Sequence, residues 1–178
     1  NMKLVNLVLT TLLAISTQVH ADETASIGDV SLGKTSHSAA FNQMKRMIGE
    51  WQGKLHQQSG TVVDTNSKFR LVSNGNTIIE TLTEDGVEMI TTYSDREGVL
   101  VIKHYCALGT EPTFRVASMN ENSIQLTLDP RNGYQPDHHN FVETMGWTFN
   151  SEDDVRVDAS LYIDGDLEVQ HSIIRRLD

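Results

Sequence analysis

The apolar and polar residues of this chain follow two different periods, and the change falls at Gly49. Before Gly49, apolar side chains recur on one stripe at helical spacing, at Phe41, Met44, Met47 and Ile48. Ser38 can cap the start of a short amphipathic helix, and Gly49 can end it. After Gly49 the period becomes two, and turn pairs such as Asp85-Gly86 recur, which is typical of strands.

Runs rich in Val, Ile, Thr and aromatic residues lie between these turns and predict about ten strands. The expected strands cover residues 51–58, 61–72, 77–83, 87–94, 99–106, 113–119, 123–128, 141–149, 155–163 and 167–176. The connections are too short for crossover helices, so neighbouring strands should pair antiparallel in sequence order. Closing such a sheet removes its exposed edges. We therefore expect an all-β fold, an antiparallel meander barrel with one short N-terminal helix, wide enough to hold a small ligand.

One connection is much longer than the others and covers residues 129–140. Its length is typical of a functional loop, and we expect it to lie over the barrel mouth as a lid. Asp137, His138 and His139 form a cluster in it that could bind a surface metal. A solvated loop is the expected state, because adjacent histidines in a flexible segment need support to be aimed at one ion.

The residues before the helix predict a signal peptide followed by a flexible leader. Residues 1–21 combine a basic start at Met2-Lys3, a short apolar run and the tripeptide Val19-His20-Ala21, which is the pattern of a secretory signal peptide. An N-terminal anchor or a core helix is the alternative. Residues 22–37 show no sustained period and predict a flexible leader. Residues 38–178 then form the barrel domain, and we expect a periplasmic or secreted protein.

Composition narrows the function classes. The 24 acidic residues exceed the 14 basic ones, giving a formal net charge of −10, so no basic surface is available for nucleic acid. The single cysteine excludes an intrachain disulfide framework and a zinc ribbon. The apolar run of the predicted signal peptide is too short to span a bilayer comfortably, so no membrane span is expected in the mature form. A small apolar molecule is the expected partner.

Strict alternation along the strands predicts which side chains face the barrel interior. On 141–149 the apolar face is Phe141, Glu143, Met145, Trp147 and Phe149. The same rule places a set of polar residues inside, namely Glu80, His104, Cys106, Glu143, His171 and Arg175. Polar groups in a ligand-sized apolar interior are candidates for function. The predicted ligand-binding residues are Glu80, His104, Cys106, Glu143, Trp147 and His171. The alternative is a structural network in which His171 and Arg175 hold Glu143.

Gly49-Glu50-Trp51 stands between the predicted helix and the first strand, and Arg175-Arg176 stands on the last strand. This arrangement resembles the lipocalin and calycin pattern, in which the Gly-x-Trp tryptophan closes one end of the barrel. The resemblance implies a basic side chain packed across that ring, a cation–π contact. It therefore implies structural roles for Trp51 and Arg175.

A second resemblance rests on His104-Tyr105-Cys106 followed by Gly109 and Pro112. This stretch is similar to a His-Tyr-Cys-x-x-Gly-x-x-Pro signature in an uncharacterised family of secreted bacterial calycin-like domains. The similarity covers about residues 41–178 and implies the fold, without an established function. The chain departs from that family at Lys103, where a Thr is usual. The family's His-x-His tract is absent as well, and Glu143 occupies the equivalent region.

A looser resemblance, to the nitrobindin family, rests on Gly49-x-Trp51-x-Gly53 and on His171 in the last strand. It implies a ten-stranded barrel with heme bound through that histidine. A heme pocket needs an imidazole that faces a wide apolar cavity. No Cys-x-x-Cys-His occurs, so covalent heme is excluded. The expected cofactor is none, with heme on His171 as the alternative.

Few residues favour an enzyme. His104 and Cys106 share a strand face, but side chains two apart stand about 6.5–7 Å apart, so a nucleophile–base pair is not assured. His104, His171, Glu80 and Glu143 could form a metal site of two histidines and carboxylates, yet they come from four strands. No serine elbow or phosphate loop occurs. The sequence predicts a binding barrel without assigned catalytic or metal residues. A heme or metal protein, or a small enzyme pairing Glu143 with His104, is the alternative.

Overall fold

The computed structural model describes residues 25–33 and 35–177, and the chain divides into two compact units. In the first unit, β1 (Ser26–Ile27) and β2 (Val30–Ser31) form a short antiparallel hairpin within the predicted leader. The predicted signal peptide, residues 1–21, lies outside the described residues. Lys34–Asp178 form the second unit.

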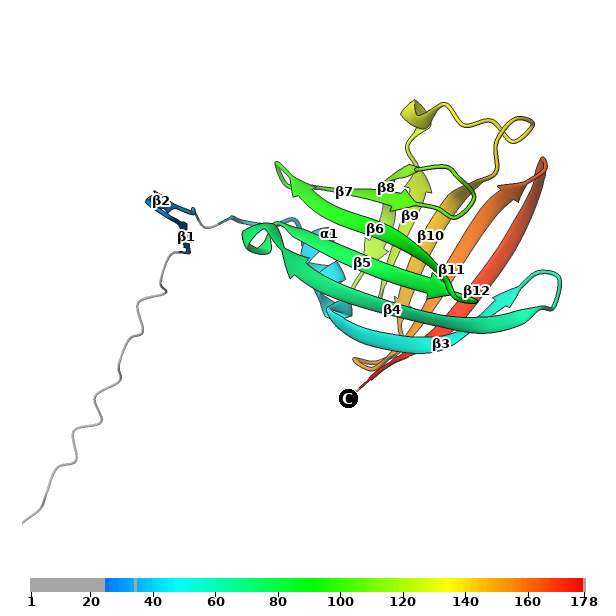
Figure 1. Ribbon diagram of the computed structural model, residues 1–178, viewed down its shortest axis with the longest axis horizontal. Coiled ribbons are helices and arrows are strands. Elements are labelled where there is room, and N and C mark those ends of the chain that lie inside the picture. The colour runs from blue at the N-terminus through cyan, green and yellow to red at the C-terminus, as the bar shows by residue number, and fades with distance from the viewer. Residues whose placement is uncertain (1–24, 34, 178) are drawn as a thin grey trace, which may run out of the picture. The chain divides into compact units, whose positions relative to one another are not determined.

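The second unit contains a closed barrel of antiparallel strands in the order β10-β11-β12-β3-β4-β5-β6-β7-β8-β9 (Figure 1). The strands are β3 (Gly49–Gln57), β4 (Val62–Val72), β5 (Thr77–Glu84), β6 (Val87–Arg96), β7 (Val99–Tyr105), β8 (Thr113–Asn120), β9 (Ser123–Leu128), β10 (Phe141–Phe149), β11 (Asp154–Ile163) and β12 (Asp166–Arg176). Each strand pairs with the next in sequence, and β12 pairs with β3 to close the barrel. The predicted all-β meander barrel is confirmed, and strand ends lie within two residues of those predicted.

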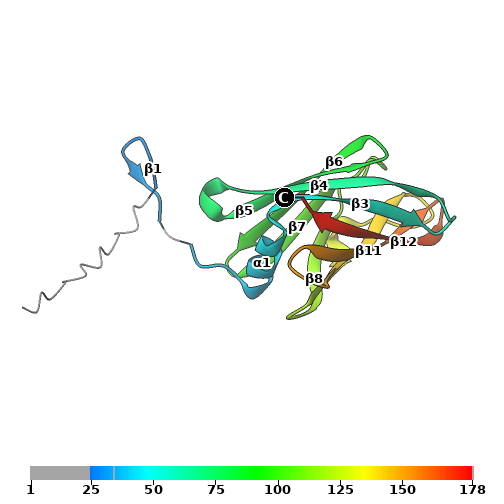
Figure 2. The ribbon, with the colours of Figure 1, turned by 90° about the horizontal axis from the view of Figure 1, so that it is seen from below.

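A short helix fills one end of the barrel. α1 (Ala39–Met44) continues into the 3-10 turn η1 (Lys45–Met47), and the Ser38 hydroxyl caps α1 by accepting a hydrogen bond from the Phe41 amide at 3.1 Å. Phe41, Met44 and Met47 are fully buried and join the apolar core. The helix lies at the barrel end where the chain terminates after β12 (Figures 1 and 2). Within residues 25–33 and 35–177, no helix is long and apolar enough to cross a membrane.

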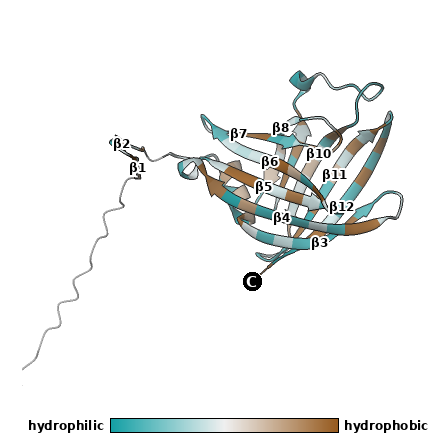
Figure 3. Cartoon of the chain, viewed as in Figure 1, coloured by the Kyte–Doolittle hydropathy of each residue, from teal (hydrophilic) through white to brown (hydrophobic). Residues whose placement is uncertain are grey.

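Buried and exposed residues alternate along strands such as β4 and β7. Hydrophobic and hydrophilic residues are interspersed along the barrel strands (Figure 3). On β4, for example, Thr65, Ser67 and Phe69 are buried while their neighbours are exposed. The interior is therefore apolar near the helix and carries polar side chains further along the strands. The candidate site lies in the part of the barrel that carries these polar side chains, away from the helix.

The inner face predicted for the last strand is wrong. The buried residues of β12 are Ser172 and Ile174, whereas Val169 is 55% exposed and Ile173 is 44% exposed. The prediction followed the apolar residues Leu167, Val169 and Ile173, which form the outer face of this strand. His171 and Arg175 share that outer face, so neither side chain enters the barrel.

The inner face predicted for β10 is also wrong at its N-terminal end, because the strand contains a β-bulge. Val142 pairs with Leu161 and Thr144 pairs with Ser160, so Glu143 is an extra residue with no partner on β11. Such a bulge breaks the alternation that places side chains. Val142 faces the cavity in place of Glu143, which is half-buried and does not line it.

The long loop, residues 129–140, contains the 3-10 turn η3 (Pro130–Asn132) and is fixed at the barrel rim. The Glu111 amide donates to the Tyr134 hydroxyl at 2.9 Å, and Asn140 exchanges hydrogen bonds with Asp164. Tyr134 stacks on Phe141, with ring centroids 5.3 Å apart. No residue of this loop lines the cavity, so the structure does not place it as the predicted lid.

Candidate functional site

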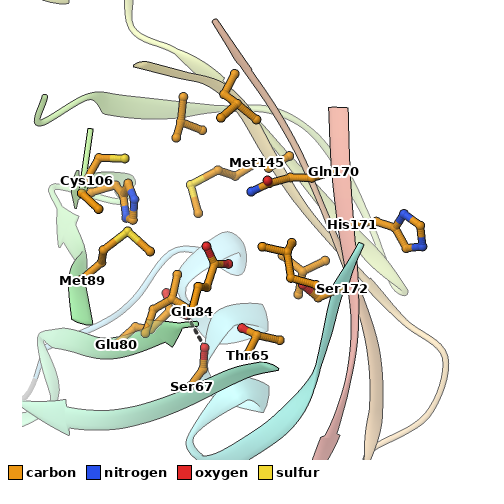
Figure 4. A pocket seen from close by; sticks show the side chains of 18 of the residues that line it. Thr65, Ser67, Glu80, Glu84, Met89, Cys106, Met145, Gln170, His171 and Ser172 are labelled. Atoms are coloured by element: carbon orange, nitrogen blue, oxygen red, sulfur yellow. Dashed lines mark hydrogen bonds between the residues drawn. The ribbon is translucent and has the colours of Figure 1, made fainter. Parts of the chain in front are cut away.

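A cavity of about 220 Å³ occupies the half of the barrel away from the helix. It is bounded by the C-terminal halves of β5 and β7, the N-terminal half of β6, and parts of β3, β4, β10, β11 and β12. Figure 4 shows side chains that line it. Most of its walls are apolar, formed by Leu55, Leu82, Met89, Val142, Met145, Trp147, Val157, Ala159, Leu161 and Ile174. An engineered apolar cavity of about 150 Å³ holds benzene, so this space suits a molecule of one ring with a substituent.

Glu80 lies inside the barrel, as the alternation predicted, and is 4% exposed. Its two carboxyl oxygens accept hydrogen bonds from the Ser67 hydroxyl at 2.8 Å and the Tyr93 hydroxyl at 2.6 Å. Burial raises the pKa of Glu80, and hydrogen bonds from Tyr93, Ser67 and Thr91 oppose that rise. Glu80 is therefore a cavity carboxyl whose oxygens already have protein partners.

His104 also lines the cavity, on the inner face of β7, and is 3% exposed. Its Nδ1 lies 2.9 Å from the Thr91 hydroxyl. Burial lowers the pKa of His104 to about 4, so the imidazole is neutral at pH 7. Within the described part of the chain, the other ring nitrogen, Nε2, has no hydrogen-bond partner. This leaves one imidazole nitrogen available to a bound molecule.

Glu84 is a cavity residue that the sequence reasoning missed. It ends β5, on the same face as Glu80, and its carboxyl group points into the cavity (Figure 4). Burial and the nearby charge of Glu80 together raise the pKa of Glu84 to about 7. The alternation Ile78, Glu80, Leu82 continues to Glu84, so extending the predicted strand by one residue would have found it.

Further polar groups complete the walls. Cys106 is half-buried and lines the cavity as predicted, and burial raises the pKa of its thiol, which favours the unreactive protonated form. The amide of Gln170 reaches into the cavity from β12, opposite Glu84 (Figure 4). Ser172 follows on the same inner face. Trp147 is fully buried and meets Tyr93 edge-on, with ring centroids 5.9 Å apart.

His171 does not enter the site. Its backbone borders the cavity, but its ring points away from it (Figure 4). The ring stacks on His56 of β3 at the outer wall, with centroids 5.0 Å apart and planes 6° from parallel. The orientation that the nitrobindin resemblance requires, an imidazole facing the cavity, is therefore not met by His171.

The residues predicted as a possible metal site do not come together in the structure. Of its four candidate ligands, Glu143 and His171 lie outside the cavity, so the set is not brought together. Among residues 25–33 and 35–177, no group of three or more His, Cys, Asp or Glu side chains is arranged to hold a metal ion. The small-enzyme alternative loses its predicted pair for the same reason, because His104 is inside the barrel and Glu143 is not.

Trp51 closes the helix end of the barrel, as the calycin resemblance implied. It is 1% exposed, and its indole N–H donates to the Met47 carbonyl at 2.7 Å. The predicted partner, Arg175, is wrong: Arg176 lies over the ring, with its guanidinium carbon 4.3 Å from the centroid. Register explains the change, because Arg176 pairs with Trp51 across the closing strands while Arg175 pairs with Gln52 and points outward.

Comparison with known proteins supports the fold alone. No protein-family model matches the sequence, and no curated protein does. A protein of unknown function from the DUF3598 family of Nostoc punctiforme PCC 73102 matches at a TM-score of 0.56 and 11% identity. That match covers 83% of this chain and 54% of the other, so this chain spans about half of that protein. A redesigned β barrel, mFAP1, bound to DFHBI matches at a TM-score of 0.40 and 12% identity, over 75% of this chain and 98% of the barrel.

Proposed function

We propose that this protein binds a small, mostly apolar molecule inside its barrel, as a carrier or binding protein. The cavity of about 220 Å³, walled by apolar side chains and open to a few polar groups, carries this proposal. Binding sites for small molecules combine these features. The predicted signal peptide supports action in the periplasm or outside the cell, where the resemblance to secreted calycin-like domains also points.

The polar side chains of the cavity orient the bound molecule. Glu80 and Glu84 lie on β5 and His104 lies on β7, the two strands that flank β6, so the three residues occupy one side of the cavity. Apolar side chains from β10 and β11 form the opposite side. A ligand with one polar end and one apolar end satisfies both sides, and its polar end lies against β5 and β7.

Calorimetric titration with benzyl alcohol tests the proposal, because this compound has one ring and one polar end. Ala159→Phe fills the cavity from β11, and Ala159→Leu fills it in part. Val169→Phe adds similar bulk on the exposed outer face of β12 and serves as the matched control. We expect the wild type and Val169→Phe to bind equally, Ala159→Leu more weakly and Ala159→Phe not at all. Equal binding by folded Ala159→Phe, checked by thermal unfolding, would place the ligand elsewhere and overturn the proposal.

A further inference from the structure

The polar side of the cavity carries acidic groups without a basic partner. Two carboxyl groups, Glu80 and Glu84, enter it from the same face of β5. The described residues that line the cavity include no Lys or Arg. The imidazole of His104 is neutral at pH 7, so it supplies no compensating cation. A carboxylate in an apolar space is stabilised by a nearby cation, and the described residues around this cavity do not provide one.

His104 adds a hydrogen-bonding group to the same side of the cavity. Its Nδ1 lies 2.9 Å from the Thr91 hydroxyl, so that nitrogen already has a protein partner. The other ring nitrogen, Nε2, is left to a bound molecule, and in a neutral imidazole it accepts a hydrogen bond when the proton is on Nδ1. His104 is 3% exposed, so this free nitrogen is reached only from the cavity.

Glu84 is the carboxyl best placed to meet a ligand. The oxygens of Glu80 accept from Ser67 and Tyr93, whereas the Glu84 carboxyl projects into the middle of the cavity (Figure 4). Burial and, to a lesser degree, the charge of Glu84 raise the pKa of the Cys106 thiol, which follows β7 on the same side. A cation beside Glu84 therefore meets carboxyl oxygens and has Nε2 of His104 on the same side of the cavity.

We propose that the ligand is a small primary amine with an apolar body, and that its ammonium group pairs with Glu84 and donates to Nε2 of His104. An ammonium group has three N–H donors and one positive charge, which complements a side of the cavity that carries two carboxyl groups and no Lys or Arg among its described lining residues. The aromatic or aliphatic body lies against Met145, Leu161 and their apolar neighbours. The proposal rests on the proposed binding function and specifies the chemistry of its ligand.

Binding of an amine is coupled to protons at this site. The ammonium favours the ionised form of Glu84, whose pKa burial raises to about 7, so binding near pH 6.5 releases a proton. The other ionisable side chains that point into the cavity are Glu80 on the same strand, His104 on β7 and Cys106 directly after β7. Affinity for the amine therefore falls as the pH drops below 7. Affinity for a neutral ligand of the same shape changes less.

Titration calorimetry at pH 7.5 with benzylamine and benzyl alcohol separates the two proposals, because the compounds differ only in the charged group. We expect benzylamine to bind about tenfold more tightly, the effect of one charge-assisted contact. Glu84→Gln should remove that preference. Glu88→Gln, which removes one exposed carboxylate from β6, is the matched control and should keep it. Titrations at pH 6.5 in buffers of different ionisation enthalpy measure the released proton.

The outcomes are distinct. Equal binding of both compounds, or an unchanged preference in Glu84→Gln, would overturn the amine proposal and leave the proposed binding function standing. Binding of neither compound would overturn both.

Discussion

Arg176 covers the indole ring of Trp51 at 4.3 Å while its guanidinium group donates to the carbonyl oxygens of Ile48 at 2.6 Å and Arg46 at 2.7 Å. The Arg176 side chain of β12 thus connects Trp51 of β3 with the backbone at the end of η1. The contact closes the barrel at its helix end and leaves the other end to the cavity.

This contact predicts different effects for two adjacent arginines. Arg176→Ala removes charge-assisted hydrogen bonds and the cation–π contact, so the free energy of unfolding should fall by about 2–3 kcal/mol. Arg175→Ala removes one exposed ion pair with Asp154 and should cost about 0.5 kcal/mol or less. Urea unfolding measures both, and equal losses would contradict the assignment of Arg176.

Gly53 predicts a second structural effect. A Cβ atom at this position would lie 2.1 Å from the carbonyl oxygen of Ile173 on the neighbouring strand β12. Backbone cannot move aside as a flexible side chain can, so Gly53→Ala should destabilise the barrel by about 1–3 kcal/mol. Gly33→Ala, where the added atom meets open space, is the control and should leave stability unchanged.

Glu84 predicts how stability depends on pH. Its pKa rises from 4.5 to about 7 on folding, so between these values the unfolded chain ionises first. The free energy of unfolding should therefore decrease by about 3 kcal/mol from this group as pH rises from 4.5 to 7, and then level off. Glu84→Gln should match the wild type near pH 4.5 and be more stable at pH 8. Parallel stability curves for the two proteins would contradict the buried setting of Glu84.

His104 predicts a distinct titration by nuclear magnetic resonance. Burial lowers its pKa to about 4, so its ring should stay neutral down to about pH 5. Since the unfolded chain takes up this proton near pH 6.5, stability from His104 is present above that pH and is lost as pH falls toward 4. Nitrogen-15 shifts of the ring follow this titration. A midpoint near pH 6.5 would contradict the buried setting of His104 in the cavity.

The fold followed from the sequence because alternation and turn residues act locally and agree along nearly the whole barrel. The site followed only in part. Glu80, His104 and Cys106 lie inside because their strands alternate without interruption. Glu143 does not line the cavity, since the bulge beside it is a feature of pairing with β11 that β10 alone does not reveal.

The inner face of β12 was predicted wrongly for a different reason. Its outer face carries the apolar residues Val169 and Ile173, whereas its inner face carries Gln170 and Ser172 where it borders the cavity. The rule that the more apolar face of a strand points into the barrel fails where the strand borders a cavity lined by polar side chains. The misassigned His171 and Arg175 follow from that one inversion.

The corrected placement of Glu143 gives a further prediction about binding. Glu143→Gln should leave the affinity for benzylamine unchanged, because this side chain does not line the cavity. The same change at Glu84 should weaken binding about tenfold. Calorimetry on the two variants compares them directly, and a loss at Glu143 equal to that at Glu84 would return Glu143 to the site.

The position of a bound ligand tests the central claim most directly. A crystal of the protein soaked with 4-bromobenzyl alcohol can be examined for the anomalous signal of bromine. The account predicts a bromine peak inside the barrel, among Met145, Ala159 and Leu161, with the hydroxyl end toward Glu84. A peak found only on the outer wall, or an empty cavity at saturating ligand, would contradict it.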